Sequence, residues 1–170
     1  ATLAEGTGKT VEIVDLSKDP VLRTIELNAG DKLVLTVFKP AYHWNGGGTL
    51  SDLTIRKAGT DEAVDVAEQL SGDKAASALG TLELVGISDF HRFQNLKYVK
   101  PLQKDAEGVW KLGNTTITVK LKDGALNFHH NGRTNGSPER GTAPALVFTA
   151  AQSGSYDLSG SIRFHCGKKD

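Results

Sequence analysis

The 170-residue sequence contains a single cysteine, Cys166, no methionine and no long apolar run. One cysteine excludes a disulfide within the chain and a zinc site built on several cysteines. No stretch approaches the roughly 18 consecutive apolar residues of a membrane helix, so we expect no membrane span. Basic and acidic residues number 20 each, which gives a formal net charge of zero. Nucleic acid is therefore not an expected partner, although a local basic patch would not show in this count.

Motifs of common enzyme classes are absent as well. The chain has no G-x-S-x-G elbow, no H-E-x-x-H pair and no complete Walker loop. Its carboxylates are scattered, and no pair can be placed together from spacing alone, as a glycosidase would require. We therefore predict that the protein is not an enzyme and uses no cofactor.

Glycine and turn-forming pairs, in contrast, are abundant. There are 19 glycines, and Asn-Gly or Asp-Gly pairs stand at 45–46, 123–124, 131–132 and 135–136. Such pairs accept positive φ and make tight turns. Apolar residues alternate with polar ones in the runs between the turns, at 10–15, 23–27, 32–38, 50–56, 81–87, 109–112, 115–121 and 125–129. Many short strands at close spacing predict one β-domain over residues 1–170.

Residues 145–165 give the clearest strand pattern. Apolar residues alternate before and after a Ser-Gly-Ser turn at 153–155, which we interpret as an antiparallel hairpin. Residues 61–70 instead have helical spacing, with Thr60 or Asp61 as the expected N-cap. Residues 90–103 fit either a long loop or an irregular edge strand. We predict an all-β, jelly-roll-like antiparallel sandwich with one short flanking helix.

One candidate ligand site lies in residues 40–49, which we expect to form a loop. Tyr42, His43 and Trp44 precede three consecutive glycines there. Exposed aromatic rings can stack on sugar rings, and Asn45 and Asp52 could bind the hydroxyl groups. The structural alternative is that Trp44 caps the end of the sandwich and the glycines only turn the chain.

A second candidate lies in residues 89–95. Phe90, His91 and Arg92 offer a ring, an imidazole and a guanidinium that could form a second wall of the same ligand site. The structural alternative is an amphipathic edge in which Phe90 and Phe93 are buried.

Three histidines, His129, His130 and His165, are candidate metal ligands. His129 and His130 are adjacent, so a strand would place them on opposite faces, where they could share a metal ion only if the strand broke. Together with His165 and Cys166 they suggest a copper site, but no histidine follows Cys166 and the chain lacks methionine. We predict no bound metal, with these three histidines as the only candidates.

Two segments resemble a known kind of domain. Thr149, Ala150, Gly154 and Tyr156 match a T-A-x-x-x-G-x-Y corner. A second set matches a closing strand and loop, namely Gly30, Asp31, Val37, Asp52 and Ile55. Both patterns are similar to those of carbohydrate-binding-like β-sandwich domains in exported planctomycete proteins. In that family the corner precedes the closing segment, whereas here it follows, so the chain is either permuted or completed by a neighbour's strand.

The resemblance implies a non-catalytic, extracellular carbohydrate-binding module with a polysaccharide or glycan as its partner. Two alternatives stay open. One is a structural subunit of a surface layer or fibre that self-associates by β-strand addition. The other is a metal-binding or protease-inhibitory β-domain, because an A-G-D-x-L-x-L strand also occurs in immunoglobulin-like cysteine-protease inhibitors. The start Ala-Thr-Leu-Ala fits a cleaved, exported protein, so we expect it to be secreted, periplasmic or at the cell surface.

Overall fold

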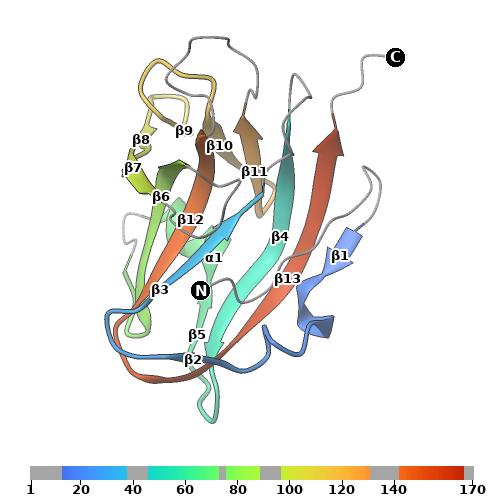
Figure 1. The fold of residues 1–170 in the computed structure, drawn as a ribbon, viewed down its shortest axis with the longest axis vertical. Helices are drawn as coiled ribbons and strands as arrows, with labels where there is room; N and C mark the ends of the chain where they lie inside the picture. The colour runs from blue at the N-terminus through green and yellow to red at the C-terminus, as the bar shows by residue number, and fades with distance from the viewer. Residues whose placement is uncertain (1–12, 38–45, 73–75, 89–96, 131–141, 167–170) are drawn as a thin grey trace.

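The structure, a computed structural model, describes residues 13–37, 46–72, 76–88, 97–130 and 142–166. These residues form two antiparallel sheets and one short α-helix (Figure 1). The prediction of an all-β sandwich with one short helix is therefore confirmed.

The larger sheet has nine strands in the described part of the chain. Its main path runs β1-β13-β4-β11-β10-β9-β8, with β2 beside β13 and β5 beside β4. Their bounds are β1 (Ile13–Asp15), β2 (Ile25–Leu27), β4 (Gly46–Lys57), β5 (Ala63–Asp65), β8 (Gln103–Lys104), β9 (Val109–Lys111), β10 (Thr118–Lys122), β11 (Ala125–His130) and β13 (Gly154–Cys166). A 3-10 turn, η1 (Leu16–Lys18), follows β1.

The smaller sheet has four strands in the order β3-β12-β6-β7. They are β3 (Lys32–Thr36), β12 (Thr142–Ala150), β6 (Gly80–Ser88) and β7 (Lys97–Pro101). The register between β6 and β7 shifts between Gly86 and Ile87, so β7 is the irregular edge strand that the weak periodicity of residues 90–103 allowed. Residues 89–96 of that segment lie outside the described residues.

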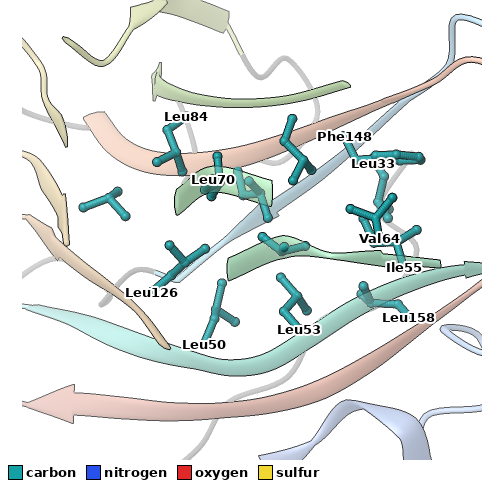
Figure 2. Packing of buried hydrophobic residues seen from close by; sticks show 14 of the residues in the cluster. Leu33, Leu50, Leu53, Ile55, Val64, Leu70, Leu84, Leu126, Phe148 and Leu158 are labelled. Carbon is teal, nitrogen blue, oxygen red and sulfur yellow. The ribbon is translucent and has the colours of Figure 1, made fainter. Parts of the chain in front are cut away.

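The main core lies between the two sheets (Figure 2). Leu33, Leu84 and Phe148 enter it from the smaller sheet, and Leu50 and Leu126 enter it from the larger sheet. All five side chains are at least 94% buried. Removing such a side chain from water stabilises the fold by about 1.5–3 kcal/mol, so burial on the inner faces holds the sheets together.

Strand β12 is buried on both faces. Its alternate residues belong to a second cluster, which consists of Val85, Ile87, Ala143, Ala145 and Val147. Both faces of the strand therefore demand apolar residues, and residues 143–148 read as an almost continuous apolar run rather than an alternating one.

The predicted hairpin over residues 145–165 is wrong. Strand β12 pairs with β3 and β6, whereas β13 pairs with β4, β1 and β2. Residues 151–153 therefore pass from one sheet to the other. The fully buried Tyr156 donates its hydroxyl to the carbonyl oxygen of Gln152 at 2.8 Å, and its ring meets Phe148 edge-on at 5.9 Å. This arrangement is a tyrosine corner, which fixes the chain where it changes sheets.

Strand β13 finds its partners within its own chain. Strand β4 lies along one edge, while β1 and β2 cover separate parts of the other. Residues 161–163 of β13 pair with residues 13–15 of the same chain. This part of the strand therefore does not need a strand from a neighbouring molecule.

The helix differs from its prediction. Helix α1 spans Val66–Ser71, and its N-cap is Asp65, whose carboxylate accepts from the Glu68 amide at 2.9 Å. Thr60 and Asp61 are therefore not the cap, because residues 63–65 form β5, in which the buried Val64 pairs with Ile55. No helix in the described ranges is long and apolar enough to cross a membrane.

Candidate functional site

The strand ends that lead into the predicted ligand loops lie at one end of the sandwich. In the larger sheet, Gly46 is in register with His130 and with Cys166. In the smaller sheet, Ser88 is in register with Thr142. Because β12 and β13 run in opposite directions from the short connection at 151–153, Thr142 and Cys166 lie at the same end (Figure 1).

Most of the predicted ligand residues cannot be placed on this frame. Tyr42, His43, Trp44 and Asn45 lie outside the described residues, as do Phe90, His91 and Arg92. What the structure describes is the frame beside them, namely Gly46 after the first segment and Ser88 before the second. These two residues belong to different sheets but lie at the same end of the sandwich.

The three glycines of the first segment are not in a loop. Residues 46–49 are the start of β4, which corrects the prediction of a loop over residues 40–49. A side chain at Gly47 would collide with the carbonyl oxygen of Phe128 on β11. One at Gly48 would collide with the Val37 side chain and approach the carbonyl oxygen of Arg163 on β13 to 3.0 Å. Glycine at these positions therefore leaves room for β11, for β13 and for Val37.

Asp52 has a structural explanation. Its φ of 54° is left-handed, and it lies in a bulge of β4 opposite Gly160 of β13. The bulge gives β4 one extra residue, so that both Leu50 and Leu53 face the core. Asp52 is six positions from Gly46, about 20 Å along a strand, so the structure does not bring it to the end of the sandwich. Its contact with a ligand stays a prediction.

The three candidate histidines occupy two adjoining positions. His129 and His165 both lie opposite Gly47, and His130 lies opposite Gly46. Strand β11 is continuous through His130, so consecutive residues alternate between its faces. In the part of the chain that the structure describes, no group of three or more His, Cys, Asp or Glu side chains could hold a metal ion. Partial burial, and then the charge of Lys120, lower the pKa of His129 below its ordinary value of 6.5.

Sequence reasoning missed a set of polar side chains on the outer face of the larger sheet. We call this set the polar face, and its members alternate with core residues along four neighbouring strands. It consists of Thr49 and Ser51 of β4, Ser161 and Arg163 of β13, Asn127 and His129 of β11, and Thr118, Lys120 and Lys122 of β10. The alternation of polar and apolar residues along each strand predicts that these side chains face solvent. Only the order of the strands in the sheet brings them together.

The register arranges this face in lines across the strands. Arg163, Thr49, Asn127 and Lys120 form one line through β13, β4, β11 and β10. Within it the Thr49 hydroxyl bonds the Asn127 side-chain oxygen at 2.8 Å. Strands in a sheet are about 4.8 Å apart, so the backbones of Arg163 and Lys120 are about 14 Å apart. The line therefore has a cation at each end and hydrogen-bonding groups between them.

Scans against protein-family models, curated proteins and solved structures found no match to this chain. The resemblance to carbohydrate-binding-like sandwiches therefore rests on the residues quoted for it. Of these, Tyr156 and Gly154 form the corner between the sheets, and Asp52 forms the bulge of β4. Their positions explain the motifs as features of a sandwich and name no ligand.

Proposed function

We propose that the protein is a non-catalytic carbohydrate-binding domain that acts outside the cytoplasm. Tyr42 and Trp44 stack on sugar rings, and Asn45 binds hydroxyl groups. Phe90, His91 and Arg92 supply a second wall. Glycan polymers are met chiefly outside the cell, which is why we place the domain there.

One observation supports this proposal above the others. The strand residues that adjoin the two aromatic segments, Gly46 and Ser88, lie at the same end of the sandwich but in different sheets. Loops carried on a rigid sandwich end are a common way to build a binding site. Two segments of aromatic and polar residues attached there can act on one ligand, although Gly46 and Ser88 are 42 positions apart in the sequence.

The experiment is a glycan array probed with the full chain, Trp44→Ala and Trp44→Phe. Stacking on a single ring contributes little beyond the entropy lost on association, so binding will be weak and a multivalent display is needed. Trp44→Ala is expected to lose the signal, whereas Trp44→Phe keeps an aromatic face and retains most of it. Thermal unfolding of both variants shows whether they are folded. An array without any bound glycan, or an equal signal from Trp44→Ala, would contradict the proposal.

A further inference from the structure

We propose that the polar face binds a linear acidic polysaccharide, a chain of sugar rings that carries carboxylate or sulfate groups at intervals. This inference rests on the proposed function, since it takes the ligand to be a glycan. It adds a second surface, on the sheet rather than at its end, and assigns the charge of the ligand.

The first argument is the distribution of charge. Arg163, Lys120 and Lys122 are exposed, and none of them forms an ion pair with any residue that the structure describes. The nearest described carboxylates along these strands are at the border of the face. Asp15 lies opposite Ser161, Asp52 follows Ser51, and Asp123 follows Lys122. The nine residues of the polar face therefore include three cations and no carboxylate, although the chain as a whole has a formal net charge of zero.

Two carboxylates near the polar face, Asp15 and Asp105, form hydrogen bonds and ion pairs with residues outside it. Asp15 accepts from the amide and the hydroxyl of Ser17, at 3.0 and 2.6 Å. On the β9 side, Asp105 accepts from Lys111 at 2.6 Å and from the Val109 amide. These bonds lower the pKa of both carboxyl groups and tie them to their own loops. Asp15 also pairs with Lys18 at 3.7 Å, so each of the two carboxylates has a cation partner outside the polar face.

The second argument is the chemistry between the cations. Thr49, Ser51 and Ser161 carry hydroxyl groups, and Asn127 carries an amide. Ala125 is the one apolar residue between them, and the exposed Ile13 lies opposite Arg163, at the edge of the face. A stable protein partner normally needs an apolar centre in its interface, which this face lacks. Hydroxyl and amide groups instead match the hydroxyl groups of sugars.

The third argument is distance. The backbones of Arg163 and Lys120, at the two ends of the central line, are about 14 Å apart. A polymer with repeated charges contacts both ends at once, and the second contact forms within the complex already made by the first. A charged polymer is therefore favoured over a free monosaccharide acid.

The test measures binding of the full chain to three polymers by isothermal titration calorimetry. Polygalacturonate is the acidic glycan, its fully methyl-esterified form has the same backbone without charge, and polyglutamate is an acidic chain without sugar rings. The test variant is the double substitution Lys120→Gln with Arg163→Gln. Its matched control is Arg23→Gln with Lys32→Gln, which removes two exposed charges before β2 and on β3.

We expect the wild type to bind polygalacturonate about tenfold more tightly than the esterified polymer. Each exposed ion pair with the ligand is weak, and two of them together account for a preference of this size. The test variant is expected to lose most of this preference, and the control variant to keep it. High salt should weaken binding to polygalacturonate more than binding to the ester.

Three results would overturn the inference. Equal binding of polygalacturonate by the test variant and the wild type would remove the polar face from recognition, while leaving the Trp44-dependent glycan site intact. Binding of polyglutamate as tight as that of polygalacturonate, with the same dependence on Lys120 and Arg163, would make the ligand an acidic peptide. Binding of none of the polymers would exclude the inference, and the Trp44 array would then decide the proposed function separately.

Discussion

The corner at Tyr156 provides the sharpest test of how this fold is held together. Tyr156→Phe removes one oxygen atom and leaves the ring in its edge-on contact with Phe148, at 5.9 Å. The lost interaction is the 2.8 Å hydrogen bond to the carbonyl oxygen of Gln152. A neutral hydrogen bond contributes about 1 kcal/mol net. Gln152 is partly exposed, so water can hydrate its carbonyl, and the larger penalty for a buried unpaired acceptor does not apply.

The expected loss in the free energy of unfolding is therefore about 1 kcal/mol, or about 3 °C in Tm for a domain of this size. Urea denaturation measures it, with an unchanged m-value as the sign that both proteins unfold alike. Tyr156→Ala is the comparison, because it also empties a fully buried ring position and should cost about 3–5 kcal/mol. If Tyr156→Phe matched the wild type, or lost as much as the alanine variant, the hydroxyl would not have the role described.

The same residue makes a prediction about pH. Burial, and then the negative charge of Glu62, raise the pKa of Tyr156 above 10.0. The folded state thus holds the phenol proton more tightly than the unfolded state does. This contribution to stability is complete below pH 10 and is lost as the pH rises through the pKa of the folded state. The free energy of unfolding should fall less steeply above pH 10 in Tyr156→Phe than in the wild type, and equal slopes would refute the assignment.

Three further predictions concern the larger sheet. Gly160→Ala should destabilise the fold by about 1–3 kcal/mol in urea denaturation, because φ is +132° and the added Cβ would lie 2.9 Å from the Ser51 carbonyl oxygen. Asp52→Gly should leave Tm nearly unchanged, whereas Asp52→Val should lower it, because a β-branched residue tolerates the φ of 54° poorly. Lys120→Gln should raise the pKa of His129 toward 6.5 in an NMR titration, since the charge of Lys120 helps to lower it; an unchanged value would contradict that cause.

The strands themselves could be read from the sequence because a period of two reports the environment of each side chain. Residues 32–36 and 125–129 alternate and are strands. The same period does not identify the partner of a strand, which explains the error over residues 145–165. A turn of Ser-Gly-Ser is compatible with a hairpin and with a crossing between sheets. The hydrogen bond of Tyr156 back to Gln152 selects the crossing here, and it is visible only in three dimensions.

Local spacing was also misleading where pairing with a distant strand decides the structure. Ala63, Val64, Ala67 and Leu70 have the spacing of a helix face. In the fold, Val64 is buried opposite Ile55 in β5, and the helix begins only at Val66. Pairing with β4 thus overrides a helical pattern that is too short to be stable alone.

The triple glycine shows the same limit at the candidate site. Next to Trp44 it reads as a flexible loop, and glycine is indeed the usual residue for turns. The structure requires glycine for another reason, because a side chain at Gly47 would collide with the Phe128 backbone, and one at Gly48 would collide with the Val37 side chain. Nothing within residues 40–49 indicates that two strands from much later in the chain will flank this segment.

The polar face could not have been predicted by any local pattern. Thr49, Lys120, Asn127 and Arg163 are ordinary residues for the solvent-exposed side of a strand. Lys120 and Asn127 come from one hairpin, whereas Thr49 and Arg163 come from distant parts of the sequence. Only the order β13-β4-β11-β10 places them in one line. A one-residue slip of β11 against β4 would move Asn127 to the inner face and Leu126 or Phe128 to the outer face. The register that buries the core is therefore the same register that assembles the face, so its chemistry is fixed as firmly as the fold itself.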